Sequence, residues 1–281
     1  DNVVDRLSIS DINHYGIVIS GNATIVDLSV SNWLFSSDTI AISLSNDDPN
    51  SANISVSNVS VSSALSENDG VAIETKTDGI TNFGECEFVD ITVNDCVRLY
   101  QGSDAISVEI RDGIYDGLIN GSVLGRGIQL GTDVNVICDN MVFSNVLNAV
   151  HTGSDDCYLN MSNCTINFDA PMTNGAIYIT NSALITLLNI DYVQRVAGSG
   201  QNAIHADGSA VVNVFQEQSH YFGGSTNYFW FFDDNITATI NSIDNCLDAD
   251  TQFRALGVNY NDLAQVSATG NEDGTTIGGC L

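Results

Sequence analysis

The feature that most constrains this chain is a short pattern repeated at a nearly constant spacing. Segments that open with alternating apolar and polar residues recur at intervals of 23 to 29 residues. They begin near Ala23, Ala52, Ile80, Ile106, Val134, Cys157, Leu184, Val211, Ile236 and Leu263, after a partial unit from Asp5 to Asn22. A sustained period near 27 residues is typical of stacked repeats, in which each unit packs mainly on its two neighbours.

Each unit contains two short strands and leaves no room for a helix. The first strand alternates, as in ANISVSNVSV, and after a polar corner comes a second strand such as NAVHT or NAIHA. Strand formers dominate the apolar residues, and proline occurs only twice. A helical crossover between parallel strands needs a dozen residues or more. The pattern therefore predicts an all-β fold in which the chain winds as a parallel solenoid.

This pattern resembles the right-handed parallel β-helix of the pectin-lyase-like superfamily, and most of all the β-helices of phage tailspikes and other virion-surface spikes. The resemblance covers roughly residues 5 to 262 and implies about ten coils of about 27 residues. We predict a parallel β-helix over residues 1–262 and a Gly-rich C-terminal cap or linker over residues 263–281. The chain starts at Asp1, almost directly in a coil, so we interpret it as an excised piece whose uncapped N-terminal end contacts other virion or surface proteins.

The second strand of each unit predicts which side chains point inward and which point outward. One position is expected to form an apolar ladder in the core: Ile73, Leu99, Ile128, Val150, Ile177, Ile204 and Phe229. The next residue then points outward, in a row of Ser43, Glu74, Tyr100, Gln129, His151, Tyr178, His205 and Trp230. Rings combined with hydrogen-bonding groups favour either a glycan-binding surface or an interface with another chain.

Polar residues at the corner after the first strand predict a second ladder. Asn58, Asp112, Asn140 and Asn163 fall at this corner, and the same alignment places Cys86 and Ser242 there in two other units. In families of this kind, stacked asparagines at the turn bond to backbone groups of neighbouring coils.

Acidic residues recur in the turn after the second strand. Asp78, Asp104, Asp133 and Asp155 hold matching positions, where they either serve turn geometry or bind a cation such as Ca²⁺. Asp155 and Asp156 resemble the aspartate pair of polygalacturonases, although the Gly-His-Gly and Arg-x-Lys motifs of that family are absent. With Glu74, these two residues are the candidate catalytic carboxylates. Arg98 and Arg126 lie near the outward row, on a side that the pattern leaves open.

Composition narrows the function classes. The formal net charge of −28 argues against binding to nucleic acid or to an anionic membrane surface. There is no stretch of apolar residues long enough for a transmembrane helix. The seven cysteines have no CxxC spacing, which argues against a zinc site. The pattern requires no cofactor, and Ca²⁺ at the acidic turns is the one candidate.

These observations lead to one preferred function and two alternatives. We predict an extracellular or virion-surface spike or fibre protein, a homotrimer that attaches to host-surface glycans. The first alternative is a secreted polysaccharide lyase or glycoside hydrolase, and the second is a surface adhesin stalk. The outward row and the acidic turns separate these functions only if their geometry is known.

Overall fold

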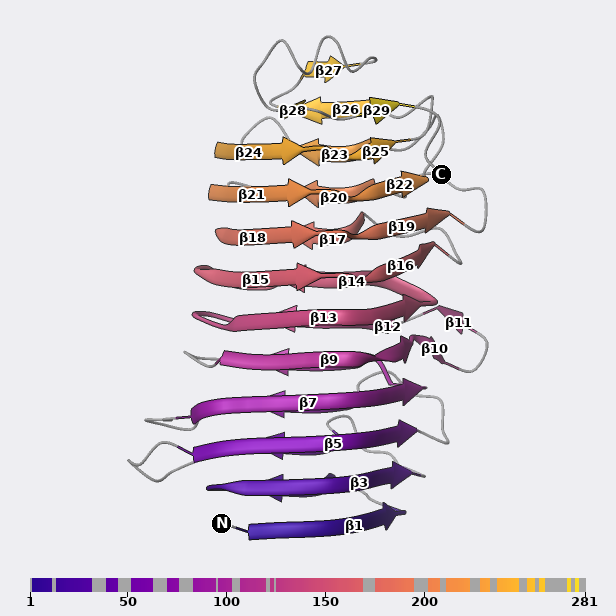
Figure 1. The fold of residues 1–281 in the computed structure, drawn as a ribbon, viewed down its shortest axis with the longest axis vertical. Coiled ribbons are helices and arrows are strands. Elements are labelled where there is room, and N and C mark those ends of the chain that lie inside the picture. The colour runs from indigo at the N-terminus through magenta and orange to yellow at the C-terminus, as the bar shows by residue number, and fades with distance from the viewer. Residues whose placement is uncertain are drawn as a thin grey trace.

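The chain alternates between two stacked parallel sheets, which form the main walls of a solenoid (Figure 1). The predicted parallel β-helix is confirmed. In Figure 1 the chain runs from left to right along the front strands, returns from right to left behind them and rises with each turn. This is a right-handed winding, the usual sense of crossovers between parallel strands. The computed structural model describes residues 2–11, 14–31, 39–44, 52–62, 70–75, 83–94, 96–102, 107–119, 122–123, 125–168, 175–194, 202–207, 211–222, 228–232, 237–247, 252–255, 258–260, 272–273 and 276–277.

The first sheet, called sheet 1 below, contains the longer strands. Its main path has eleven strands: β1 (Asn2–Ser10), β3 (Ala23–Ser31), β5 (Ala52–Ser62), β7 (Phe83–Asn94), β9 (Ser107–Asp116), β13 (Asn135–Ser144), β15 (Cys157–Ser162), β18 (Ala183–Leu188), β21 (Val211–Glu217), β24 (Thr237–Ile243) and β28 (Glu272–Asp273). From β13 onward the sheet continues past the corner in separate short strands: β16 (Thr165–Phe168), β19 (Asp191–Gln194), β22 (His220–Phe222), β25 (Cys246–Leu247) and β29 (Thr276–Ile277).

The second sheet, called sheet 2, also has eleven strands, against the ten coils expected from the repeat. They are β2 (Tyr15–Ile19), β4 (Ile40–Leu44), β6 (Val71–Thr75), β8 (Arg98–Gly102), β12 (Gly125–Leu130), β14 (Val146–Thr152), β17 (Gly175–Ile179), β20 (Asn202–Ala206), β23 (Tyr228–Phe232), β26 (Gln252–Ala255) and β27 (Val258–Tyr260). All but the last pair are parallel. A small hairpin, β10 (Leu118–Ile119) with β11 (Ser122–Val123), lies between β9 and β12.

A left-handed residue marks the bend within sheet 1 in each successive coil. This position has a φ of 51° to 57° and is held by Asp27, Asn58, Asp90, Asp112, Asn140, Asn163, Asn189, Gln218 and Asp244. Asn and Asp tolerate this conformation better than other residues with a side chain. The predicted corner position is confirmed for Asn58, Asp112, Asn140 and Asn163. It is wrong for Cys86 and Ser242, the residues expected at the corner in two other units.

In both of these units the bend lies later in the chain than the alignment placed it. Asp90 and Asp244 hold the bend where Cys86 and Ser242 were expected. Cys86 instead points into the core with 2% of its surface exposed, and this burial raises the pKa of its thiol to about 12. Because β7 is longer than the repeat average, counting from the start of the strand reaches the bend too early.

The core consists of side-chain rows that stack from strand to strand. One row begins with Val30, Val61 and Val93 and continues through Tyr115, Phe143, Ile166, Tyr192 and Tyr221, all fully buried. The change from valine to aromatic rings requires small residues on the facing wall. At Gly127, for example, a Cβ atom would lie only 2.9 Å from the Phe143 ring. Ring volume on one sheet is thus matched by missing volume on the other.

Candidate binding surface on sheet 2

The strand register places one side chain per coil in a row on the outer face of sheet 2. We call this row the outer ladder: Glu74, Gln101, Gln129, His151, Tyr178, His205, Phe231 and Arg254. Ser43, predicted for the row, stacks below Glu74 and is buried. Every member of the outer ladder is half-buried. Adjacent strands are about 4.8 Å apart, so neighbouring side chains are within contact distance.

Two residues predicted for the outward row lie inside the molecule instead. Tyr100 pairs with Ile73 and Ile128, and its hydroxyl lies 2.8 Å from the Thr75 Oγ1 in the core. Trp230 pairs with Ile204 and has 1% of its surface exposed. The following residues, Gln101 and Phe231, take the outward positions. Leu99 and Phe229 are buried as predicted, but one position earlier than the inward ladder to which they were assigned.

The error arises because strict alternation breaks within these strands. Two successive residues are buried in each of them, as in Leu99 with Tyr100. In β23 the Phe229 ring contacts Tyr221, whereas the Trp230 ring contacts Phe253, so both rings lie inside. The alternating pattern then no longer shows which of the two buried residues is aligned with the inward residue of the neighbouring strand.

The rings of the outer ladder contact one another in a continuous series. His151 stacks on Tyr178, with ring centroids 5.2 Å apart and planes 9° apart. Tyr178 meets His205 edge to face at 5.4 Å, and His205 meets Phe231 in the same way at 4.6 Å. The guanidinium carbon of Arg254 lies 5.0 Å from the Phe231 ring centroid, which is a cation–π contact. These contacts hold the side chains in fixed orientations on the surface.

A second outward position adds two arginines beside this ladder. Arg98 and Arg126 are register partners on β8 and β12, so like charges stack at one strand spacing. The Nε atom of Arg98 donates a hydrogen bond of 2.6 Å to Oε1 of Gln129, a member of the outer ladder. We call Arg98, Arg126 and His151 the basic cluster. In a chain with seven Lys and Arg residues and a net charge of −28, two of the few positive charges thus lie next to each other and repel each other.

The charge state of His151 follows from its place in this cluster. Burial, and then the nearby charge of Arg126, lower the pKa of His151, while Asp207 opposes the shift. Asp207 Oδ2 accepts a hydrogen bond of 2.5 Å from the Tyr178 hydroxyl. Among the described residues, the Nδ1 atom of His151 is buried and has no hydrogen-bond partner. The surroundings of His151 therefore favour its uncharged imidazole.

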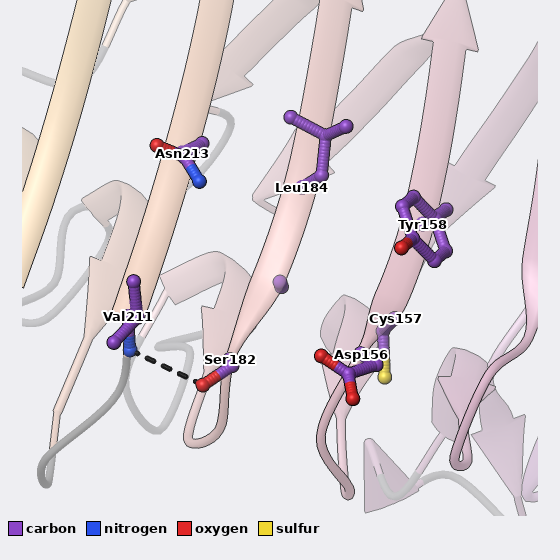
Figure 2. Close-up of a pocket in the computed structure, with 8 residues that line it drawn as sticks. Asp156, Cys157, Tyr158, Ser182, Leu184, Val211 and Asn213 are labelled. Carbon is purple, nitrogen blue, oxygen red and sulfur yellow. Dashed lines mark hydrogen bonds between the residues drawn. The ribbon is translucent and has the colours of Figure 1, made fainter.

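The three candidate catalytic carboxylates, Glu74, Asp155 and Asp156, do not come together in one site. Glu74 lies on β6, which is three strands away from β14 in sheet 2. Asp155 and Asp156 lie in the turn that follows β14. Three strand spacings are about 14 Å, more than the 5–9.5 Å that separates the carboxylates of glycoside hydrolases. Asp156 instead lies on the outer surface of sheet 1, where it lines an open pocket with Tyr158, Ser182 and Asn213 (Figure 2).

The predicted metal ligands are only partly within the described residues. Asp78 and Asp104 lie outside them. Because Asn135 pairs with Tyr158, Asp133 is level with Asp156 rather than with Asp155. Asp133 and Asp156 both have a positive φ, which serves the turn. Asp155 Oδ1 accepts a hydrogen bond of 3.1 Å from the Ser182 backbone nitrogen. In the described part of the chain, no three His, Cys, Asp or Glu side chains are grouped so as to hold a metal ion.

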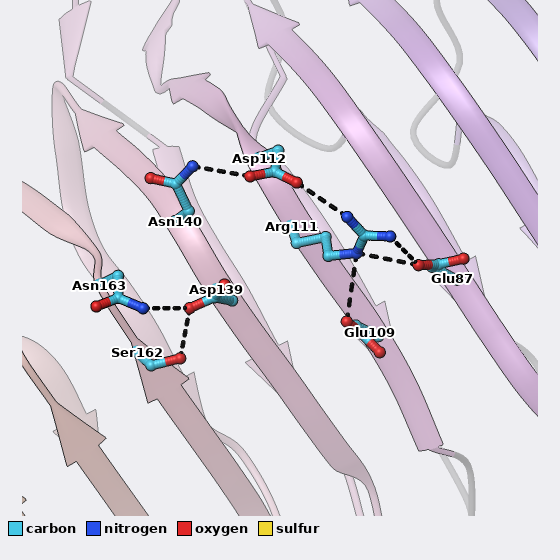
Figure 3. Close-up of polar contacts among 8 residues, drawn as sticks. All are labelled: Glu87, Glu109, Arg111, Asp112, Asp139, Asn140, Ser162 and Asn163. Carbon is cyan, nitrogen blue, oxygen red and sulfur yellow. Dashed lines mark hydrogen bonds and ion pairs between the residues drawn. The ribbon is translucent and has the colours of Figure 1, made fainter.

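Arg111, on sheet 1, shows how a surface arginine in this chain is otherwise accommodated (Figure 3). Its guanidinium lies 2.5 Å from Glu87 Oε1, 3.0 Å from Asp112 Oδ2 and 3.4 Å from Glu109 Oε1. A hydrogen bond from Asn140, and then the contact with Arg111, lower the pKa of Asp112. Arg126 differs, because its guanidinium makes no hydrogen bond or ion pair within the described residues.

Comparison of the chain with protein families, curated proteins and solved structures found no match. Within its described residues there is no helix long and apolar enough to span a membrane. The site therefore has to be interpreted from its own geometry. Sequence reasoning missed Gln101, Phe231 and Arg254 as members of the outer ladder. The stacking of Arg98 on Arg126 could have been detected by aligning strand starts, GVAIE with VRLYQ and GRGIQ.

Proposed function

We propose that the outer face of sheet 2 binds an extended glycan that carries acidic groups, with the sugar chain running across the strands along the outer ladder. The observation that supports this most strongly is Arg126, a half-buried arginine with unused hydrogen-bonding capacity beside Arg98 and His151. A guanidinium forms bidentate hydrogen bonds with a carboxylate, so the basic cluster suits the acidic group.

The rest of the outer ladder suits the sugar rings and their hydroxyls. Gln101 and Gln129 each bring an amide with donors and an acceptor. Phe231 and Tyr178 bring half-buried aromatic surface. Fixed side chains lose little conformational entropy when a ligand binds, which favours affinity.

The overall charge limits which acidic glycans fit. With a formal net charge of −28, the protein repels a polyanion over distances of about one Debye length, roughly 8–10 Å at physiological salt. The basic cluster offsets this only locally. A glycan with widely spaced acidic groups is therefore favoured over one that is charged at every sugar.

In this proposal the solenoid is an attachment protein that acts outside cells or on a virion surface. A tailspike-like homotrimer is part of the same proposal. Light scattering tests it directly, because the solution mass of a trimer is three times the 29.9 kDa of one chain. The separation of Glu74 from Asp155 and Asp156 gives no support for a two-carboxylate hydrolase, so cleavage is not proposed.

The test is a binding titration of sialyllactose against neutral lactose, with three versions of the protein. Wild type is expected to bind sialyllactose at least about tenfold more tightly than lactose, and Arg126→Gln to remove that preference. Arg6→Gln is the matched control: it deletes the same charge at a side chain that is 82% exposed and paired with Asp27 on sheet 1. Equal affinities for both sugars, or equal effects of the two substitutions, would overturn the proposal.

A further inference from the structure

A second surface feature lies on sheet 1 and takes no part in the proposed glycan site. It is an open pocket of about 320 Å³ over three neighbouring strands, β15, β18 and β21 (Figure 2). Its walls include Asp156, Tyr158, Ser182, Leu184, Val211 and Asn213. A volume near the lower end of the ~300–1,000 Å³ of small-molecule sites fits one compact ligand rather than a polymer.

The register shows how the strands build this pocket. Tyr158 pairs with Leu184 and Leu184 with Asn213, so these three side chains form one outward row across the sheet. Asp156, Ser182 and Val211 lie two residues earlier and form a second outward row. Between the rows, Cys157 and Ala183 point inward and are buried, which leaves a floor of backbone and small side chains. The pocket is the space between the two rows.

The lining combines an aromatic ring and apolar walls with unused polar groups. Tyr158, Leu184 and Val211 are 45%, 37% and 50% exposed, unusual for large apolar side chains on one small area of a sheet. Within the described residues, the side chains of Asp156, Tyr158 and Asn213 make no hydrogen bond. The Ser182 Oγ accepts a 3.4 Å hydrogen bond from the Val211 nitrogen and keeps its own proton available.

We propose that this pocket binds a single uncharged pyranose unit. The Tyr158 ring provides a platform for the apolar face of a sugar, and Leu184 and Val211 extend that platform. Asp156 accepts hydrogen bonds from sugar hydroxyls, while the Asn213 amide and the Ser182 hydroxyl both donate and accept.

The local charge sets the preference for an uncharged ligand. Asp155 and Asp156 are adjacent in the turn, and Asp133 is level with Asp156 on the neighbouring coil. No arginine or lysine is among the residues that line the pocket. A carboxylate or sulfate on the ligand would therefore meet like charge without compensation. This preference is opposite to that of the basic cluster on sheet 2, so the two sites are distinguishable by ligand.

The experiment is a saturation-transfer NMR titration with four probes. Three are neutral: methyl β-D-glucopyranoside, methyl β-D-galactopyranoside and methyl N-acetyl-β-D-glucosaminide. The fourth, methyl β-D-glucuronide, carries a carboxylate. At least one neutral glycoside is expected to bind with a Kd of about 1–10 mM. The glucuronide is titrated against Arg126→Gln, so that the basic cluster on sheet 2 does not contribute, and is expected to bind at least about tenfold more weakly.

Variants then locate the binding. Tyr158→Ala and Asp156→Asn are expected to weaken the neutral glycoside about tenfold and about threefold, while Tyr158→Phe retains most of the affinity. Phe215→Ala is the matched control, because Phe215 is 44% exposed on the same sheet face and does not line the pocket. Arg126→Gln should leave this binding unchanged, whatever its effect on sialyllactose.

Three results would each overturn the inference. The first is the absence of binding by all three neutral glycosides. The second is an equal loss of binding in Phe215→Ala and Tyr158→Ala. The third is a fall in solution mass on Tyr158→Ala without any change in sugar binding, which would make this face an interface between chains. Thermal unfolding of each variant checks that the fold is retained.

Discussion

The two faces of sheet 2 are made by the same strands and have opposite chemistry. On the inner face Tyr100, Ile128, Val150, Ile177, Ile204 and Trp230 are at most 1% exposed and belong to the hydrophobic core. On the outer face the next residue of each strand is half-buried and, except for Phe231, polar or ring-bearing with a polar atom. The inner residues specify the fold, and the outer residues carry the proposed role in ligand binding.

The comparison is informative because neighbouring residues can be tested in pairs. Trp230 and Phe231 are adjacent large rings that differ in the face they occupy. Tyr100 and Gln101 are a similar pair in β8. If the two faces have separate roles, substitutions at inner positions should reduce stability, and substitutions at outer positions should mainly change binding.

The largest difference is expected for the pair of rings in β23. Trp230→Ala removes a buried ring whose centroid is 5.0 Å from that of Phe253 and is expected to reduce the free energy of unfolding by about 3–5 kcal/mol. Phe231→Ala loses contacts with His205 and Arg254 on the surface and is expected to cost about 1 kcal/mol. Urea denaturation followed by circular dichroism measures both. Similar losses for the two variants would show that Phe231 is a core residue and that the outer face is not free.

A smaller difference is expected for the pair in β8. Tyr100→Phe deletes one hydroxyl and with it the buried contact with Thr75, so the expected loss of stability is about 1 kcal/mol. Gln101→Ala should stay within about 0.5 kcal/mol of wild type, because its side chain is on the surface. The midpoints of urea unfolding compare the two. A larger loss from Gln101→Ala than from Tyr100→Phe would contradict the assignment of faces.

The sequence predicts much of this architecture because repetition is visible without coordinates. The period near 27 residues gives the solenoid, and Asn58, Asp112, Asn140 and Asn163 mark the bend that their left-handed conformation requires. The register of sheet 2 is harder, because two adjacent buried residues such as Leu99 and Tyr100 both satisfy an apolar pattern. Contacts between coils resolve the choice, and these contacts have no signature in one strand alone.

The candidate site is less predictable than the fold for a related reason. Gln129, His151, Tyr178 and His205 were expected in one row, and the register places them together. The importance of Arg126 depends on a comparison between arginines: Arg111 is surrounded by three carboxylates, whereas Arg126 has no partner in the described residues. Sequence gives both residues the same charge. Only the packing of neighbouring coils separates a neutralised cation from an available one.

The smallest expected effect is a pH dependence in which stability and binding change in opposite directions. The pKa of His151 is lowered in the folded protein by burial and by Arg126, with Arg98 adding to the shift and Asp207 opposing it. The unfolded chain therefore binds more protons than the native protein between that lowered value and the ordinary value of about 6.5. His151 contributes its full stability above this window and loses it as the pH falls through the window. Protonation also adds a positive charge beside two arginines, so the affinity for sialyllactose should rise over the same interval.

His151→Gln separates this effect from all other titrations, because glutamine is also polar but does not titrate in this pH range. Its melting temperature should fall less than that of wild type between pH 7 and pH 5, and its affinity for sialyllactose should lose the rise on acidification. A wild-type protein that gains stability on acidification relative to His151→Gln would mean that Asp207 outweighs burial and Arg126 at this site. In that case folding would favour the charged imidazole, and the basic cluster would gain its third positive charge at a higher pH than expected here.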